Sequence, residues 1–273
     1  FKHQSAIVNG KKTGSDINLY KLFAEQCYNL LREGGCCGVI IPSGIYTDLG
    51  TTALRNMLFT KTVLNDMVSL ANERYIFEGI HHAFKFCLLT FRSGGFTTEF
   101  NAVFRINTRE AISTDELEGF LNSPNNRILL TTDLINRISP DSHSIMELKS
   151  NLDIQIVEKM LTFRSIGERI NEIWNIELSQ EIHMTNDSDL FTQTPGKNDV
   201  PLVQGNMINQ FEYGALEPKY WININKGRAR ILGKNQDNRQ TLSYQSYRMV
   251  HRRIASSTNS RTAIACVLPP NYF

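Results

Sequence analysis

Apolar residues recur at intervals of three and four between residues 19 and 31. They are Leu19, Leu22, Phe23, Cys27, Leu30 and Leu31, within the stretch INLYKLFAEQCYNLLREGG. This period is typical of an amphipathic helix that buries one of its faces. Asp16 is placed to cap the N-terminus of the helix, and Gly34 and Gly35 provide a stop at its C-terminus.

Short apolar runs follow this helix and alternate with a second helical pattern. The run CCGVIIP at 36–42 is continuously apolar, which predicts a strand buried on both faces and ended by its proline. Residues 47–59 predict a helix that opens at Asp48 or Thr51. TVLNDMVSL and AFKFCLLTF then predict two more strands, at 62–70 and 83–91. This order indicates an α/β fold, as in half of a doubly wound sheet.

The rest of the chain has a different texture. FTTEFNAVFRI, at 96–106, alternates as an antiparallel edge or hairpin strand does, and 113–123 predicts a short helix capped by Thr114. A helical pattern at 151–170 precedes a series of short apolar pieces, GRARILG among them, which polar turns separate. We therefore expect two domains, 1–150 and 151–273, the second of them loop-rich and strand-biased.

The composition is that of an ordinary globular protein. Apolar residues make up 41% and charged residues 21%, and no run of apolar residues is long enough to span a membrane. The first residues resemble no signal peptide and lack an initiator Met, so we expect part of a longer cytoplasmic chain. The cysteines form no CxxC pair, and adjacent His81 and His82 would point to opposite faces of a strand. We expect reduced thiols and no metal site.

Motifs of several common enzyme classes do not occur in the sequence. There is no GxGxxG loop, no GxxxxGK loop and no GxSxG nucleophile elbow. Neighbouring carboxylates such as Asp187 and Asp189 lie in polar segments, where capping accounts for them as well as acid–base chemistry does. Residue types and spacing alone therefore identify no catalytic group.

Positive charge is concentrated between residues 226 and 261. This segment holds nine Lys or Arg and a single acid, Asp237, whereas the net charge of the whole chain is only +2. Its part SYRMVHRRIASSTNSRT mixes Tyr, Arg and His with Ser, Thr and Asn, which are residue types that contact phosphates and base edges. On a helix, Arg248 and Arg252 would share one face. We favour nucleic-acid binding, and the alternative is a solvated surface.

Four stretches resemble, in order, amino-group DNA methyltransferases of the N6-adenine type. DINLYKLFAEQCYNLLREGGCCGVIIPSGI resembles the stretch after their Asn-Pro-Pro-Tyr motif, with an LYxxF helix and an LxxGGxxGxxxPS strand. IFEGIHHAFKFCLLTFRSGG resembles a later strand whose terminal aromatic faces the target base. PLVQGNMINQFEYGALEPKYWI and YRMVHRRIASSTNSRTAIACVLP are similar to blocks of the target-recognition domain in fused, type IIG-like restriction–modification enzymes.

The resemblance implies the C-terminal half of a Rossmann-like methyltransferase sheet, followed by a partial target-recognition domain. It also implies methyl transfer from S-adenosylmethionine to adenine N6 in double-stranded DNA, in a bacterial cell. The glycine-rich cofactor loop and the Asn-Pro-Pro-Tyr loop, which precede the LYxxF helix in the family, do not occur in these residues. We therefore expect an inactive fragment and assign no catalytic residue. A nuclease domain on the intact chain is compatible with the resemblance.

The resemblance also assigns individual roles. Phe23 matches the aromatic that borders the adenine of the cofactor, and Phe91 matches the aromatic that stacks on the extruded target base. Core packing is the alternative for both. Gly205 and Asn206 match a turn close to DNA, with a plain hairpin turn as the alternative. Further DNA contacts are expected from Arg228, Arg230, Arg248, Arg252, Arg253, Asn259 and Arg261.

Two other functional classes stay open. A non-catalytic DNA-specificity subunit of a restriction or phage-defence complex would carry the recognition blocks without the Asn-Pro-Pro-Tyr loop. A small-molecule or RNA methyltransferase would need no contacts along a duplex. The sequence upstream of this chain decides the first alternative, and a test of duplex binding decides the second.

Overall fold

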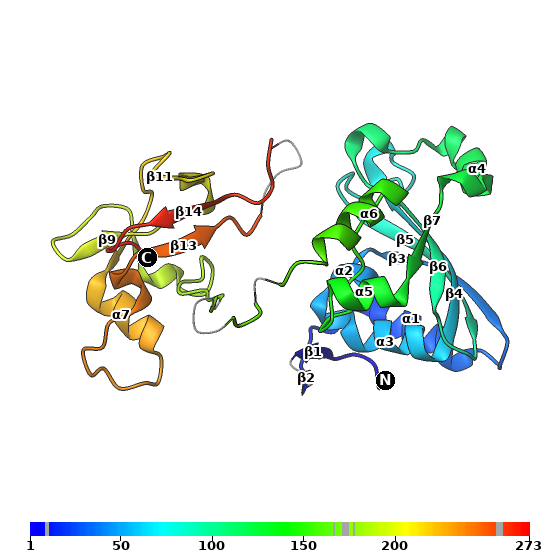
Figure 1. Cartoon of the computed structure of the whole chain (residues 1–273), viewed down its shortest axis with the longest axis horizontal. Helices are drawn as coiled ribbons and strands as arrows, with labels where there is room; N and C mark the ends of the chain where they lie inside the picture. Colours follow the sequence, from blue (N-terminus) through cyan, green and yellow to red (C-terminus); the bar gives the residue numbers. More distant parts are fainter. Residues whose placement is uncertain (9–10, 166, 171–174, 177, 255–258) are drawn as a thin grey trace. The chain divides into compact units, whose positions relative to one another are not determined.

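A computed structural model describes residues 1–8, 11–165, 167–170, 175–176, 178–254 and 259–273. The chain forms two compact units, Phe1–Glu168 and Arg169–Phe273, which are called unit 1 and unit 2 below (Figure 1). Each unit has its own hydrophobic core. Within the described residues, no helix is long and apolar enough to cross a membrane.

Unit 1 is built on a mixed five-stranded sheet with the order β3-β5-β4-β6-β7. The strands are β3 Cys36–Pro42, β4 Thr62–Ala71, β5 Lys85–Ser93, β6 Glu99–Arg105 and β7 Ile128–Thr131. β5 runs antiparallel to both β3 and β4, β4 and β6 are parallel, and β7 is antiparallel to β6. The predicted α/β class is confirmed, with β5 inserted between two strands that point the same way.

Two strands differ from the prediction in their position within the sheet. β3 is predicted to be buried on both faces, but it lies at the sheet edge, pairs with β5 alone and leaves Ile40 55% exposed. β6 is predicted as an edge or hairpin strand, but it lies between β4 and β7. Apolar content indicates a strand, whereas its neighbours depend on pairings that a local pattern does not contain.

The helix α1, Leu19–Leu30, confirms the predicted period but buries the opposite face. Its N-cap is Asn18 rather than the predicted Asp16, and the Asn18 side chain accepts a hydrogen bond from the Tyr20 amide. Leu19 and Phe23 are exposed. The buried residues of this helix are Tyr20, Lys21, Ala24 and Glu25. Two of them are charged, so the helix is fixed by polar contacts as well as by apolar packing.

The helices of unit 1 divide between the two faces of its sheet. α1 shares the larger core with α2 Gly44–Thr47, α3 Thr52–Lys61, α5 Thr132–Ile138 and α6 Asn151–Met160. α4, Thr114–Asn122, packs against the opposite face, over Val68, Leu70 and Val103. Successive residues of a strand point to opposite faces, so Met67 of β4 lies in the larger core and Val68 in the smaller one.

The helix α6 belongs to unit 1. Its residues Ile154 and Val157 pack against the larger core, and Ser150 caps its first turn by accepting a hydrogen bond from the Asp153 amide. The boundary between the compact units therefore follows this helix. The change in sequence texture, by comparison, places a domain boundary at residue 151, before the helix.

Unit 2 contains short strands and one helix in its described part. Its sheets are β8-β12-β9, β10-β11 and β13-β14, with the strands Phe191–Thr192, Trp221–Asn223, Asp199–Pro201, Ile208–Asn209, Glu212–Tyr213, Arg248–His251 and Ala265–Leu268. The piece GRARILG, which we group with the strand-biased pieces, instead forms α7, Ile224–Leu232. The ring of Phe273 packs on Gly227, where an added Cβ would lie 2.3 Å from the ring.

The guanidinium of Arg55 joins α3 to distant segments inside unit 1. The residue is 1% exposed. Nε and Nη2 donate to the Ser142 carbonyl at 3.1 and 2.8 Å, and Nη1 donates to the Ile45 carbonyl at 3.0 Å and to the Thr51 hydroxyl. Burial lowers the pKa of Arg55 to about 10, against the attraction of Asp48. The group stays charged at neutral pH, so its donors need these partners.

Replacement of Arg55 by Ala should destabilise unit 1 by about 3 kcal/mol, because the Ser142 and Ile45 carbonyls would lose their partners in a buried site. Urea unfolding followed by far-UV circular dichroism measures this loss. Arg137→Ala is the matched control, because its Asp133 ion pair is long and exposed, and it should cost less than about 0.5 kcal/mol. Equal effects of the two substitutions would contradict the structural role of Arg55.

Candidate functional site

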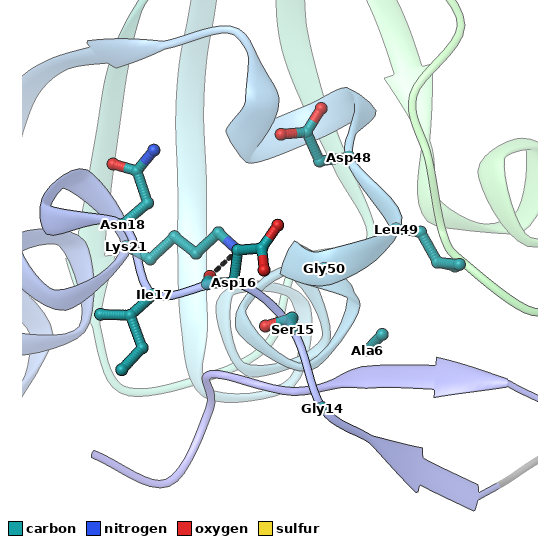
Figure 2. A pocket seen from close by; sticks show the side chains of 10 residues that line it. All are labelled: Ala6, Gly14, Ser15, Asp16, Ile17, Asn18, Lys21, Asp48, Leu49 and Gly50. Atoms are coloured by element: carbon teal, nitrogen blue, oxygen red, sulfur yellow. Dashed lines mark hydrogen bonds between the residues drawn. The ribbon is translucent and has the colours of Figure 1, made fainter. Parts of the chain in front are cut away.

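Unit 1 contains a cavity of about 420 Å³ beside the start of α1 (Figure 2). One wall comes from the residues between the hairpin β1–β2 (Ala6–Val8 and Lys11–Thr13) and α1, and includes Ser15, Asp16 and Asn18. The other wall is η1, Leu49–Thr51, with Asp48 before it. The cavity therefore lies where the segment after Pro-Ser-Gly meets the LYxxF helix.

Charged groups of both signs line this cavity. Lys21 is buried, and its Nζ donates to the Asp16 carbonyl at 2.9 Å (Figure 2). The carboxylates of Asp16 and Asp48 also line the cavity. Burial, and then the charge of Asp48, raises the pKa of Tyr20 to about 12, so its hydroxyl stays neutral. Such a set of acceptors around one buried cation suits a polar ligand that carries hydrogen-bond donors.

A buried carboxylate ties the first residues of the chain to α1. Glu25 accepts hydrogen bonds from the Lys2 and His3 amides and, at 2.6 Å, from the Gln4 side chain. Burial opposes ionisation of Glu25, but these hydrogen bonds outweigh that effect and lower its pKa. The segment that leads into the cavity wall is thus held by a group that periodicity alone would place on the solvent side.

The two predicted aromatic contacts lie in opposite environments. Phe23 is 62% exposed on the outer face of α1, so its ring is accessible to a ligand. Phe91 is 1% exposed in β5 and lies within the larger core of unit 1. Core packing, the alternative given for Phe91 above, describes its present surroundings. A stacked base would need access to that ring.

Accessible aromatic rings gather instead in the loop between β4 and β5. Tyr75 and Phe84 are exposed, and Phe77 is partly exposed and packs edge-to-face on Phe86 at 4.8 Å between ring centroids. The buried Asn72 shapes this loop, because its side chain accepts from the Phe77 amide and donates to the carbonyls of Phe77 and Ile80. The signal in the sequence is the density of aromatics in RYIFEGIHHAF.

Most of the arginines predicted to contact DNA form ion pairs or hydrogen bonds with other residues of unit 2. Arg228 pairs with Asp237, and Arg230 pairs with Asp187. Arg248 donates to the Tyr272 carbonyl at 2.8 Å and forms an ion pair with Glu181 at 3.1 Å. Burial lowers the pKa of Arg248, and Glu181 opposes that change. These guanidinium groups therefore stabilise the fold of unit 2 through their own partners.

Arg252 also bonds within unit 2. Its Nε donates to the Ile208 carbonyl at 2.7 Å, and its Nη2 donates to Asn209 at 3.1 Å. Residues 248–251 form the strand β13, so the helical arrangement considered above for Arg248 and Arg252 does not apply. Gly205 lies beside Arg252, with 3.9 Å between an added Cβ and the arginine Cγ.

The remaining predicted DNA contacts are exposed. Gly205 and Asn206 lie in η6, Gly205–Met207. Arg253 and Arg261 are exposed and have no hydrogen bond or ion pair within the described residues. Asn259 is exposed and has an interaction partner. The neighbouring positions 257 and 258 of the STNSRT block lie outside the described residues.

Loss of the Asp237 charge should weaken unit 2 at acidic pH. The hydrogen bond from Arg228 lowers the pKa of Asp237 to about 2, against an ordinary value of 3.8. Its stabilising effect is therefore complete above about pH 4 and is lost as the pH falls towards 2. The difference in unfolding free energy between wild type and Asp237→Asn should shrink over this range. A difference that does not change with pH would contradict the pairing.

Tryptophan fluorescence in urea measures this difference, because both tryptophans of the chain lie between residues 169 and 273. Asp199→Asn is a suitable control, since Asp199 bonds to the Gly196 amide and the Asn223 side chain, without a cation.

Part of the chain matches the model of a known protein family. Residues 2–77 match the family model of the Eco57I restriction–modification methylases. No curated protein matches the chain significantly. This match covers α1, β3, α3 and β4, and so includes the elements that border the cavity.

Several solved structures are similar to the chain in part. A modification subunit of a type I restriction enzyme from Vibrio vulnificus YJ016 is 16% identical with a TM-score of 0.36, over 49% of this chain and 32% of that one. The EcoKI M protein is 13% identical, with a TM-score of 0.36 over 57% and 45%. The type IIG restriction endonuclease BpuSI is 16% identical, with a TM-score of 0.39 over 79% and 28%. This chain thus spans less than half the length of each.

The family match is the finding that bears on the sequence prediction. The predicted resemblance to restriction–modification methyltransferases is confirmed by it, over residues 2–77.

Proposed function

We propose that this chain is part of a site-specific DNA methyltransferase that transfers a methyl group from S-adenosylmethionine to adenine N6 in duplex DNA. Unit 1 would supply part of the catalytic domain, and unit 2 would take part in target recognition. The family match over residues 2–77 carries the proposal. Adenine specificity and the DNA contacts rest on the motif resemblance in the sequence.

The surroundings of α1 fit a role at the edge of a cofactor site. S-adenosylmethionine supplies the methyl group and presents an adenine ring to the protein. The exposed ring of Phe23 offers a flat apolar face to such a ring. The acceptors of Asp16 and Asp48 in the neighbouring cavity can bind hydrogen-bond donors. These side chains would bind and orient a ligand, and we assign none of them a bond-breaking step.

The target base needs an aromatic surface after it leaves the duplex, because stacking on its neighbours is lost. Phe91 stays a prediction, and in its present position the core would have to open before a base could reach the ring. Phe77 and Phe84, in the loop that Asn72 holds, have accessible rings without such a change. We propose this loop as a second candidate for the base contact.

A non-catalytic DNA-specificity subunit is the alternative function. The sequence feature that favours it is the lack of a glycine-rich cofactor loop and of an Asn-Pro-Pro-Tyr loop within these 273 residues. Both functions require duplex DNA as a partner. They differ in whether a methyl group is transferred once the missing loops are supplied.

These 273 residues should transfer no methyl group above background to duplex DNA in the presence of labelled S-adenosylmethionine. The reason is that the loop that polarises the adenine amine in the family does not occur in them. Incorporation of label into DNA, with an established adenine methyltransferase as the positive control, measures this. Robust turnover by the chain would contradict our assignment of its motifs.

Duplex binding by the chain should depend steeply on salt, and the double variant Arg253→Glu/Arg261→Glu should weaken it. Each lost phosphate contact lowers the salt slope by about 0.9. Fluorescence anisotropy of a labelled duplex at several salt concentrations measures both effects. Arg92→Glu/Arg109→Glu makes the same charge change at exposed positions of unit 1 and is the control. No binding, or equal effects of both double variants, would contradict DNA recognition by unit 2.

A further inference from the structure

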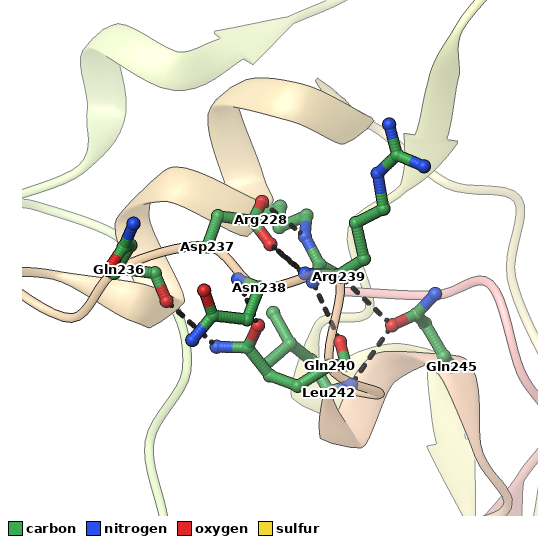
Figure 3. Close-up of polar contacts among 8 residues, drawn as sticks. All are labelled: Arg228, Gln236, Asp237, Asn238, Arg239, Gln240, Leu242 and Gln245. Carbon is green, nitrogen blue, oxygen red and sulfur yellow. Dashed lines mark hydrogen bonds and ion pairs between the residues drawn. The ribbon is translucent and has the colours of Figure 1, made fainter.

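The segment 233–245 of unit 2, called the Arg228 loop below, folds around the side chain of Arg228 (Figure 3). Nε and Nη2 of Arg228 donate to the two carboxylate oxygens of Asp237 at 2.7 and 2.8 Å. Nη2 also donates to the Gln240 carbonyl at 2.7 Å, and Nη1 donates to Gln245 at 3.1 Å. The Arg228 side chain is only 14% exposed, so its charge is used inside the unit.

Bonds within the loop fix its outer turn. The Gln240 side chain accepts from the Asn238 amide at 2.8 Å and donates to the Gln236 carbonyl at 3.2 Å. Asp237 accepts from the Arg239 amide at 2.8 Å. The backbone between residues 236 and 240 is thus held from both sides, and this turn has a defined shape before any ligand binds.

Arg239 occupies a left-handed backbone conformation that places its amide on Asp237 and leaves its guanidinium without a partner among the described residues. Its φ of +59° lies in the left-handed region, which glycine and asparagine adopt most easily. Its guanidinium extends away from the polar cluster (Figure 3). Within the described residues it has no hydrogen bond or ion pair. The amide of Arg239 is thus used inside the turn, whereas its side chain is available for a contact outside the unit.

The neighbours of Arg239 suit the same contact. Gln236 and Asn238 are exposed, and their carboxamides have no partner within the described residues. Arg recognises the guanine edge through paired hydrogen bonds, and Asn or Gln recognises the adenine edge in the same way. The loop has a net positive charge, because Arg228 neutralises Asp237 while Lys234 and Arg239 stay exposed. These features together fit the groove of a polyanionic duplex.

We propose that the Arg228 loop is a sequence-reading element, in which Arg239, flanked by Gln236 and Asn238, contacts base edges in the major groove of duplex DNA. This inference rests on the proposed function and deepens it, since it names side chains that determine the target sequence. Arg228 is a positioning residue in this scheme. It holds the loop and does not reach the DNA.

The test uses the 273-residue chain to select duplexes from a pool with a randomised central segment, followed by sequencing. Arg239→Gly removes the guanidinium and relieves the left-handed strain, so its fold should be at least as stable as wild type. It should lose discrimination at one base-pair position by about tenfold or more. Arg109→Ala, an exposed arginine in unit 1, is the matched control and should keep the wild-type preference.

Anisotropy with one duplex at several salt concentrations separates the remaining outcomes. An unchanged preference with uniformly weaker binding and a salt slope lower by about 1 would make Arg239 a phosphate contact and overturn the base contact. The proposal would also be overturned if Arg239→Gly bound DNA as the wild type does in both assays. It would likewise be overturned if the wild-type chain bound duplexes without any sequence preference. In these cases duplex binding still stands, and the proposed role of unit 2 in target recognition stands where the wild-type chain selects a sequence. No duplex binding by the wild-type chain would overturn both.

Discussion

A guanidinium removed from water needs acceptors for its donors, and that requirement organises both units. Arg55 meets it through the carbonyl oxygens of Ser142 and Ile45, and so ties the segment at Ser142 to α2 and α3. Arg228 meets it through a carboxylate, a carbonyl and a carboxamide, and so gives a polar loop its shape. In each case a planar group with donors in several directions joins segments of the chain through polar contacts.

The sequence predicted the positions of helices and strands along the chain better than it predicted which faces of them are buried. Local periodicity was sufficient for α1 and for the strands β3, β4 and β5, because the spacing of apolar residues reflects the geometry of each element. The inward face of α1 was not predictable in this way. Lys21 and Glu25 are buried there because the Asp16 carbonyl and the amides of the first residues provide partners, and those partners come from other segments.

Because the partners of a charged side chain come from other segments, the distribution of charge along the sequence also gave limited information about the site. The excess of cations after residue 226 suggested one basic face, yet Arg228, Arg230, Arg248 and Arg252 each bond within unit 2. Arg253 and Arg261 stay exposed as expected. The sequence does not distinguish Arg239 from the other basic residues of this segment, because its left-handed backbone is a property of the folded loop. For the aromatics, Phe23 lies where a ligand can reach it, whereas Phe91 had the same apolar signature as any core residue.

In the Arg228 loop, the groups that hold the loop in shape are different from the side chains that face outward. Asp237 and the Gln240 carbonyl hold the loop, whereas the side chains of residues 236, 238 and 239 face outward. Sequence change at the outward positions can therefore accumulate without disturbing the fold, provided the anchoring pair is kept. A scaffold with this separation allows a recognition surface to diversify while the molecule that carries it stays the same, and it offers a compact set of positions for a combinatorial library.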